Sequence, residues 1–421
     1  MNNYNKLEKK ISNFLKRNAI FHSKAKFFYQ QFSYFLNKKK GFKAELCNGC
    51  NIIDLKVNNG FFGYYDHTPW SQDMKHFILH IQEKESLQLN LYTFSNNKIS
   101  LKKNLIRSKF YNLQQGIRAI WINNNEIIFN QIIEKKLISS IYNIKNDSTK
   151  NIDVPIQEIS RKNNLIISID YMNLDSVNKD YGYNLDNDIS QNKISGIVGC
   201  NYLNNNILFE IEKEQIHNIS KNHNFPINEC EINHIVHSPY SNSFAFIYRN
   251  KKFNAYSELY KYNYETNDLI RLYSGKLMSH YCWINQNIIF AYLEHKDKLG
   301  FFEIDYRNSI KLTQKILPIY KDNLVDGHPS ISPNKKWIVY DTYPDKARQS
   351  YLYIVRNNLD IKPKKILLGK FHSPLKFNGY YRCDLHPRWS PDGSFISIDS
   401  THEGIRKNYL INISSILNEY E

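Results

Sequence analysis

The feature that most constrains the fold is a strand–turn–strand unit that recurs along most of the chain. Its clearest copy is HPRWSPDGSFISIDS, which begins at His386, and HPSISPNKKWIVYDT from His328 repeats the same frame. In each copy a polar turn separates two short apolar strands, a pattern typical of β-hairpins. Five looser copies begin at His67, Arg118, Ile156, His234 and His280. Repetition at a period of tens of residues indicates a modular architecture.

A further short apolar strand follows each unit, for example LNLYTF from Leu89 and SYLYIVR from Ser350. Most intervals between successive units fall near the length of one propeller blade, roughly 40–50 residues. A fourth strand of each blade would lie in the variable connectors. Short sheets packed radially leave only short, protected edges. The sequence therefore predicts an all-β fold, a seven-bladed β-propeller.

One interval is much longer than the others, the one between Ile156 and His234. It marks an insertion in the third blade that includes residues 171–206 and is rich in Asn, Asp, Gly and Tyr. This composition predicts a long ordered loop over one face of the molecule.

Residues 1–43 differ from the rest in pattern and charge. We predict a helix from Lys6 to Lys40 in a helical extension, followed by the propeller over residues 44–421. Apolar residues recur at helical spacing: Leu7, Ile11 and Phe14, then Phe28, Phe32 and Phe35. The segment carries ten Lys and one Arg against one Glu. It is either a peripheral contact for a membrane or a protein, or a helix packed on the body with a basic face in water.

The rest of the chain is only weakly basic, because residues 1–43 account for +10 of the net charge of +16. This distribution argues against nucleic acid as the partner of the body. No apolar stretch is long enough for a transmembrane helix, and no secretory signal is visible. The six cysteines are few and scattered, which predicts that the protein resides in a reducing cytoplasm. The basic segment of residues 1–43 would place it peripherally at the inner membrane face.

Histidines occupy equivalent positions in the repeats. When the units are aligned on their turns, five of the seven first positions are histidine. The aligned residues are His67, Arg118, Ile156, His234, His280, His328 and His386. In a propeller such positions ring the central channel, so these side chains should converge. Converging imidazoles bind transition metals or act as general acid and base, although a single histidine at a strand start is more often structural.

Cys383 lies three residues before His386, in the motif RCDLHPRW. A thiolate and an imidazole at this spacing, joined by His328 and His280 from neighbouring blades, would form a tetrahedral N/S metal site. We therefore predict a divalent metal held by His280, His328, Cys383 and His386, with zinc preferred to manganese. His67 and His234 then remain for catalysis or substrate contact. A separate C-x-x-C pair, Cys47 and Cys50, is a weak signal for zinc or redox chemistry.

Further polar residues suit an enzyme that acts on acidic sugars. Arg118 lies in the ring, Tyr181 and Tyr183 lie in the insertion, and Arg249 ends a strand of the fourth blade. An arginine can neutralise a uronate carboxylate, and a histidine or tyrosine can then move a proton. We name His67, Arg118, His234, Tyr181, Tyr183 and Arg249 as candidate catalytic residues. Strand pairing would explain any one of them equally well.

The quoted motifs also resemble known families. The SPDG-type turns resemble the WD40-like repeats of TolB-type propellers. FGYYDHTPW from Phe62, DGHPSISPN from Asp326, YDTYPD from Tyr340 and RCDLHPRW from Arg382 resemble the propeller superfamily of oligogalacturonate lyase and the ulvan lyases. That resemblance covers most of residues 60–415. It implies β-elimination at a uronic acid, a central manganese in the first family and a structural zinc in the second.

Two functions from different classes follow. The first is a metal-containing lyase that acts on a uronate-containing saccharide, in surface polysaccharide metabolism. The second is a non-catalytic scaffold or saccharide-binding propeller with a structural metal. Glycosyl transfer is a weaker third, because no phosphate-binding glycine motif is present.

Overall fold

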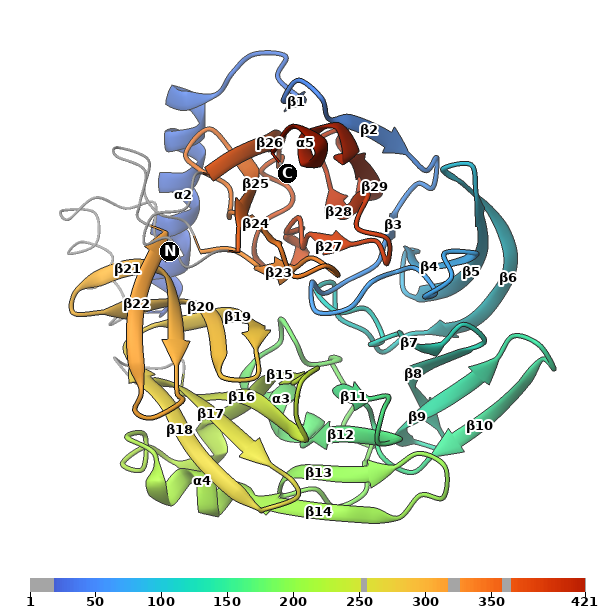
Figure 1. The fold of residues 1–421 in the computed structure, drawn as a ribbon, viewed down its shortest axis with the longest axis vertical. Helices are drawn as coiled ribbons and strands as arrows, with labels where there is room; N and C mark the ends of the chain where they lie inside the picture. The colour runs from blue at the N-terminus through green and yellow to red at the C-terminus, as the bar shows by residue number, and fades with distance from the viewer. Residues whose placement is uncertain (1–18, 251–255, 317–325, 358–364, 421) are drawn as a thin grey trace.

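The computed structural model describes residues 19–250, 256–316, 326–357 and 365–420. Seven antiparallel sheets are arranged radially around one central axis (Figure 1). The predicted seven-bladed β-propeller with a short N-terminal helical extension is confirmed. Each blade contains the hairpin recognised in the sequence. The fourth strand lies in the connector after it in the first six blades, whereas in the seventh it comes from the N-terminal part of the chain.

The first three blades follow one another along the chain. Blade 1 consists of β3 (Gly60–Phe61), β4 (His76–Gln82), β5 (Leu87–Ser95) and β6 (Lys98–Ser108). Blade 2 consists of β7 (Ile120–Asn123), β8 (Glu126–Ile133), β9 (Lys136–Asn143) and β10 (Ser148–Ile152). Blade 3 consists of β11 (Glu158–Ser160), β12 (Leu165–Ile169), β13 (Gly196–Asn201) and β14 (Ile207–Glu212).

The next two blades repeat the same order. Blade 4 consists of β15 (Glu231–His237), β16 (Ser243–Arg249), β17 (Ser257–Asn263) and β18 (Asp268–Gly275). Blade 5 consists of β19 (Met278–Asn285), β20 (Ile288–His295), β21 (Lys298–Asp305) and β22 (Lys311–Ile316). A short helix α4 (Lys213–Ile219) and a 3₁₀ turn η1 (Ile227–Glu229) connect blades 3 and 4.

The N-terminal strands complete the last two blades. Blade 6 consists of β23 (Ser330–Ile331), β24 (Trp337–Asp341), β25 (Gln349–Arg356) and β26 (Lys365–His372), with β1 (Ala44–Leu46) added outside β26. Blade 7 consists of β27 (Arg388–Trp389), β28 (Phe395–Ser400) and β29 (Lys407–Asn412), with β2 (Asn51–Asp54) outside β29. Helix α5 (Ser414–Tyr420) ends the chain, and η2 (Gly379–Tyr381) precedes blade 7. Pairing of the two ends of the chain closes the ring and hides its edges.

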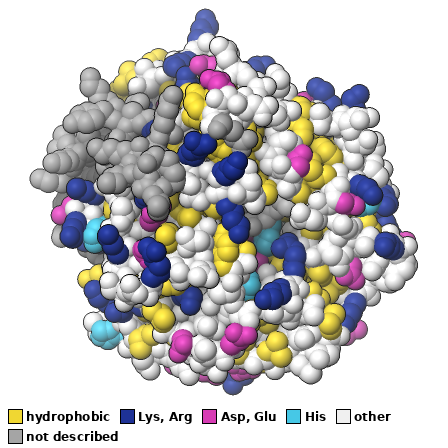
Figure 2. Space-filling view, viewed as in Figure 1, with side chains coloured by type: hydrophobic (Ala, Val, Ile, Leu, Met, Phe, Trp, Pro, Cys, Tyr) yellow, Lys and Arg dark blue, Asp and Glu magenta, His cyan; other side chains and the backbone are white. Residues whose placement is uncertain are grey.

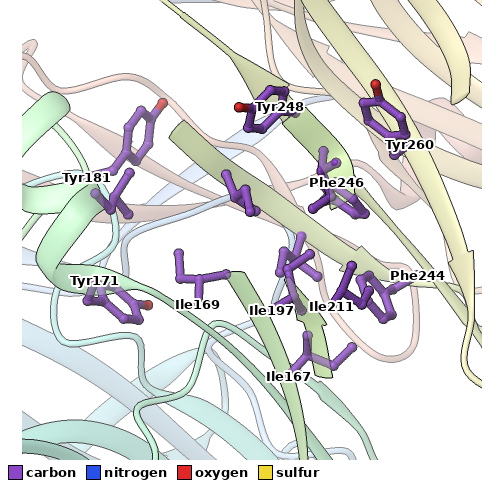
Figure 3. Packing of buried hydrophobic residues seen from close by; sticks show 14 of the residues in the cluster. Ile167, Ile169, Tyr171, Tyr181, Ile197, Ile211, Phe244, Phe246, Tyr248 and Tyr260 are labelled. Carbon is purple, nitrogen blue, oxygen red and sulfur yellow. The ribbon is translucent and has the colours of Figure 1, made fainter. Parts of the chain in front are cut away.

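Apolar side chains fill the space between neighbouring blades. Figure 3 shows one such cluster, in which Ile167 and Ile197 of blade 3 face Phe244 and Phe246 of blade 4. These inner strands are buried on both faces, so their sequences are almost continuously apolar rather than alternating. The rigid ring that results holds the channel-facing segments in fixed positions.

The insertion of blade 3 lies between β12 and β13, over residues 170–195. It contains helix α3 (Tyr171–Val177), which Asp170 caps by accepting a hydrogen bond from the Asn173 amide. The predicted insertion extended too far, because residues 196–206 include β13, an ordinary strand of the blade. The sequence could not separate this strand from the loop, since Asn-rich turns flank it.

Helix α2 (Ala19–Asn37) packs on the outside of blade 6. The Tyr34 hydroxyl lies 3.4 Å from His372 Nε2, and Asn378 donates a hydrogen bond to Gln30. The opposite side of the helix exposes Phe28, Phe32, Phe35 and Leu36, each about two thirds accessible. The predicted helical residues Leu7, Ile11 and Phe14 lie outside the described residues. Among the described helices, none is long and apolar enough to cross a membrane.

Candidate metal and acid–base site

The centre of the site is Tyr64, which follows β3 and projects among the histidines of four blades. Its ring centroid lies 5.0 Å from that of His386, 5.5 Å from His234, 6.1 Å from His328 and 6.3 Å from His280. The tyrosine is 3% exposed. Residues that are far apart in the sequence therefore meet around one aromatic side chain.

A buried ion pair in blade 7 holds the segment that carries Tyr64. Asp399 accepts hydrogen bonds from the amides of Phe62 and Gly63, both at 3.1 Å. Arg388 donates to the Tyr64 carbonyl at 2.9 Å and to Asp399 at 2.6 Å. Because a buried carboxylate and guanidinium satisfy one another and the backbone, the position of Tyr64 is fixed from across the seam between blades 7 and 1.

His328 is oriented by Asp341, the last residue of β24. Its Nδ1 lies 2.9 Å from Asp341 Oδ1, and its amide donates to the same oxygen at 2.7 Å. Burial by itself would lower the pKa of His328, but the Asp341 carboxylate outweighs burial and raises it. With Nδ1 held by a carboxylate, Nε2 is buried without a hydrogen-bond partner. A carboxylate behind an imidazole with the other nitrogen unengaged is the usual arrangement of a metal-ligating histidine.

His386 and Asp384 form a close group of metal-ligating side chains with His328. The ligand atoms of His328, Asp384 and His386 all lie within 4.8 Å of one another, and all three residues are buried. His386 Nε2 also lacks a hydrogen-bond partner. Burial, with His328 nearby, lowers the pKa of His386 well below its ordinary value, so the imidazole is neutral and able to bind a cation.

His280 lies beside this group. Its ring centroid is 4.0 Å from that of His328, and its Nδ1 faces Asp326 at 3.2 Å. Burial and then His328 lower the pKa of His280 to about 4. Gly327 lets the segment that carries Asp326 and His328 lie against the end of β24, because a Cβ there would come within 1.8 Å of the Asp341 carbonyl oxygen.

Cys383 lies outside this group of ligand atoms. Among the described residues, the two sets of metal-ligating side chains with atoms this close do not include Cys383 or His280. The Cys383 thiol is buried, its Sγ lies 4.0 Å from the Asp384 carbonyl oxygen, and burial raises its pKa to about 12. The adjacent residue Asp384 belongs to that group, with His328 and His386.

His234 pairs with Tyr64 and Arg249. The Tyr64 hydroxyl lies 2.5 Å from His234 Nδ1, and Arg249 Nη2 lies 3.2 Å from His234 Nε2. A guanidinium only donates, so Nε2 accepts from Arg249 and a neutral His234 carries its hydrogen on Nδ1. Arg249 is itself paired with Glu231 at 2.5 Å. The backbone of His234 has a φ of +54°, which turns its side chain out of the ladder of β15 into the channel.

The insertion closes this site from one end of the axis. The Tyr181 ring lies edge-on to His234 at 4.9 Å, and Asp180 pairs with Arg382, which also binds Asp384 at 2.9 Å. Tyr183 lies deeper in the insertion, where it stacks on Tyr171 and accepts a hydrogen bond from Asn130. Of the two predicted tyrosines, Tyr181 therefore contacts the histidines and Tyr183 packs on the insertion's own helix.

Tyr65 closes the site from the other end. Its hydroxyl donates to the Tyr281 carbonyl and accepts from the Tyr281 amide, both at 3.0 Å. Beyond it lies a pocket of about 410 Å³, lined by residues near the ends of the inner strands. The Lys and Arg side chains on the face seen down the axis are dispersed rather than gathered in one groove (Figure 2).

That pocket contains His67, and Arg118 lies beside it. His67 Nε2 lies 3.0 Å from Glu158, and Arg118 forms a bidentate pair with Asp66, at 3.0 Å for Nη1. The ligand atoms of Asp66, His67 and Glu158 form the second close group of the described chain. Because Arg118 binds both oxygens of Asp66, the charge of this carboxylate is already neutralised. The group therefore needs a metal less than the group of His328, Asp384 and His386 does. The structure therefore separates His67 and Arg118 from the four histidines around Tyr64.

Several residues of the site were not identified from the sequence. They are Tyr64, Asp326, Asp341, Asp384, Arg382 and Arg388. All six lie in or beside the quoted motifs FGYYDHTPW, DGHPSISPN, YDTYPD and RCDLHPRW. The signal was the presence of an acidic residue near each histidine, but the sequence does not show which carboxylate orients which ring.

Comparison with known proteins gives a fold. No family model and no curated protein matches the sequence. An oligogalacturonate lyase from Vibrio parahaemolyticus superposes with a TM-score of 0.59 at 9% identity, over 88% of this chain and 96% of that one. A structure described as oligogalacturonate lyase in complex with manganese gives 0.59 at 10% identity, over 89% and 98%. The chain has the fold of the oligogalacturonate lyase propeller.

The resemblance inferred from the sequence motifs is thus confirmed for the fold. A TolB from Acinetobacter baumannii also aligns, with a TM-score of 0.38 at 12% identity over 81% of this chain and 82% of that one. At identities this low, the superpositions on the two oligogalacturonate lyases establish only that the architecture is the same. The chemistry has to be inferred from the residues of the site.

Proposed function

We propose that the protein is a metal-dependent propeller lyase that cleaves a uronate-containing saccharide by β-elimination. The observation that carries this proposal is the close group of ligand atoms from His328, His386 and Asp384, in which both histidines have an unpartnered Nε2. This group lies beside the His234–Tyr64 pair. Two unengaged buried imidazole nitrogens are costly unless a cation or water binds them. The residues therefore fit a divalent metal.

His328, His386 and Asp384 would hold that metal, with His280 adjacent. When bound, the metal would draw electron density from a substrate carboxylate and so acidify the neighbouring C–H group. The preference for zinc depended on a Cys383 thiolate. A donor set of nitrogen and oxygen suits manganese as well as zinc, and the similar structure is described as a manganese complex.

The protein's own groups supply the proton transfers. In this proposal the substrate displaces Arg249 from His234 Nε2, and that nitrogen takes the proton from the sugar carbon. Tyr64 gives its hydroxyl proton to the leaving oxygen and is reprotonated from His234 Nδ1 across the 2.5 Å contact. Before substrate binds, Arg249 holds His234 in one orientation. Arg382 binds the uronate carboxylate in place of Asp180, which requires the insertion to withdraw. Glu231 and Asp384 keep the two guanidinium groups in place.

Four variants test the metal site. We expect wild-type protein, loaded with manganese or zinc and freed of excess ion, to retain about one equivalent by elemental analysis. Asp384→Asn and His386→Ala should lose it, whereas Cys383→Ser should retain it. Asp341→Asn should weaken binding by roughly 10–100-fold, because it only orients His328. Metal loss in Cys383→Ser with retention in Asp384→Asn would favour the N/S site instead.

An activity assay tests the proposed lyase reaction. Incubation of the metal-loaded protein with a panel of uronate oligosaccharides should produce absorbance from a new C4–C5 double bond. His234→Ala should reduce that rate by roughly 10²–10⁴-fold. His295→Ala is the matched control, because His295 ends β20 at an outer turn. No product across the panel with either metal would remove the proposed activity.

A second candidate function is a scaffold or saccharide-binding propeller in which the metal is structural. The observation that favours it is closure of the site, by Tyr181 and Asp180 at one end and Tyr65 at the other. In that case His328→Ala would mainly lower the melting temperature, and no variant would change turnover. Lost turnover at unchanged melting temperature in His234→Ala would reject the scaffold.

We also propose that residues 1–43 make a peripheral contact with a membrane or a protein, in a cytoplasmic protein. The exposed side of α2, with Phe28, Phe32, Phe35 and Leu36, supports this, since a surface helix usually turns its apolar side inward. Lys38, Lys39 and Lys40 follow directly. Sedimentation with anionic vesicles separates the alternatives, because a protein partner would leave vesicle binding absent.

A further inference from the structure

Cys47 and Cys50 lie in a tight turn between β1 and β2. The Cys50 amide donates to the Cys47 carbonyl at 3.2 Å, and Gly49 takes a φ of +88° that favours glycine. This turn brings the two Sγ atoms to 3.2 Å from one another. Cys47 is partly accessible, whereas Cys50 is buried.

The turn is the point where the N-terminal segment crosses from one blade to the next. β1 pairs with β26 of blade 6, and β2 pairs with β29 of blade 7. Helix α5 packs over the turn so closely that a Cβ at Gly49 would lie 3.0 Å from Ile416 Cδ1. A covalent bond here would therefore act on the segment that closes the propeller.

The other four cysteines lack such an arrangement. Cys200, Cys230, Cys282 and Cys383 are buried and belong to blades 3, 4, 5 and 7. Within the described chain, neither close group of metal-ligating side chains includes Cys47 or Cys50. Two thiols alone would leave a zinc ion short of ligands, so redox chemistry is favoured over metal binding.

We propose that Cys47 and Cys50 are a redox-active dithiol that forms a disulfide by exchange with a low-molecular-weight disulfide. The Cys47 thiolate attacks one sulfur of that disulfide and releases one small thiol, which takes up the Cys47 proton. Cys50 then attacks the Cys47 sulfur, and the second small thiol leaves with the Cys50 proton. The protein loses two protons and two electrons, and the small disulfide takes them up and becomes two thiols.

Accessibility sets the order of these two steps. Cys47 is the side chain that an oxidant can reach. Burial, followed by the hydrogen bond to Cys47, raises the pKa of Cys50, so Cys50 acts second, from within the protein. The bond between them would fix the turn and thereby hold β1 and β2 against blades 6 and 7.

Oxidised glutathione is the probe for the test. Full-length reduced protein treated with it and then alkylated should lose the mass of two hydrogens, with Cys47 and Cys50 joined in one peptide. Cys50→Ser should instead keep a glutathionyl group on Cys47, and Cys47→Ser should remain unmodified. Cys200→Ser is the matched control and should oxidise like the wild type.

Hydrogen exchange measures whether the disulfide holds β1 and β2 more firmly against blades 6 and 7. Amides of residues 44–54 should exchange several-fold more slowly in the oxidised protein, and Cys47→Ser should show no response to oxidant. Wild-type protein that stops at the glutathionylated stage, or in which another pair of cysteines becomes linked, would overturn the proposal. Unchanged exchange of these amides in a fully oxidised protein would show that the disulfide does not stabilise the pairing of β1 and β2 with blades 6 and 7.

Discussion

The free energy of unfolding is expected to fall steeply as the pH is lowered from about 6.5 to about 4. His80 and His402 are buried and His237 is partly buried, and desolvation lowers the pKa of each to about 4. These histidines stay neutral in the folded protein, whereas an unfolded chain binds a proton to each below its ordinary pKa of 6.5. Their stabilisation is therefore complete above pH 6.5 and is lost as the pH falls toward 4.

His80 shows why the protonated ring is excluded. Its Nδ1 lies 2.7 Å from the Phe62 carbonyl, and its Nε2 accepts from the Ile117 amide at 3.3 Å, so a second proton has no acceptor. A pKa lowered from 6.5 to about 4 corresponds to about 3 kcal/mol from this residue. Denaturant unfolding near pH 7 and near pH 4.5 measures the loss.

His80→Gln is the comparison variant for this prediction. It has no titrating ring, so its stability should depend on pH less steeply by about 1.4 kcal/mol per pH unit. An equally steep dependence in His80→Gln would show that this residue is not a source of the acid sensitivity.

Asp399→Ala is expected to destabilise the protein by about 3–5 kcal/mol, because it leaves the Arg388 guanidinium buried without its carboxylate. The same change removes the acceptor of the Phe62 and Gly63 amides. For a chain of this length the melting temperature should fall by roughly 3–6 °C. Thermal unfolding followed by circular dichroism measures the shift.

Asp305→Ala is the control for the buried pair. Asp305 pairs with Arg307, a largely exposed side chain at a turn, and such pairs contribute about 0–1 kcal/mol. Equal losses in the two variants would mean that the Asp399–Arg388 pair does not hold the seam between blades 7 and 1.

The candidate site was predictable in part. The alignment of repeats identified His234, His280, His328 and His386, which the structure brings together around Tyr64. It also grouped His67 and Arg118 with them, and the structure places those two beside Glu158 and Asp66 instead. An alignment of repeats shows which blade a residue belongs to. How far along the channel its side chain lies depends on local irregularities of the strands, which the alignment does not show.

Neighbouring residues in one motif were harder to separate. Cys383 and Asp384 are adjacent, and spacing alone favoured the thiol as a ligand. In the structure Asp384 forms a close group with His328 and His386, whereas Cys383 is buried outside that group. Side-chain direction changes from one residue to the next in an extended segment, so an error of one position exchanges the ligand.

The sequence by itself determined the number of blades and the strands of each hairpin, since these depend on local alternation and turn residues. Tertiary structure alone decided two contacts between distant segments. It placed Tyr64 among four blades and laid Tyr181 over His234. Each contact arises from ring closure and from the packing of the insertion, which no local pattern encodes.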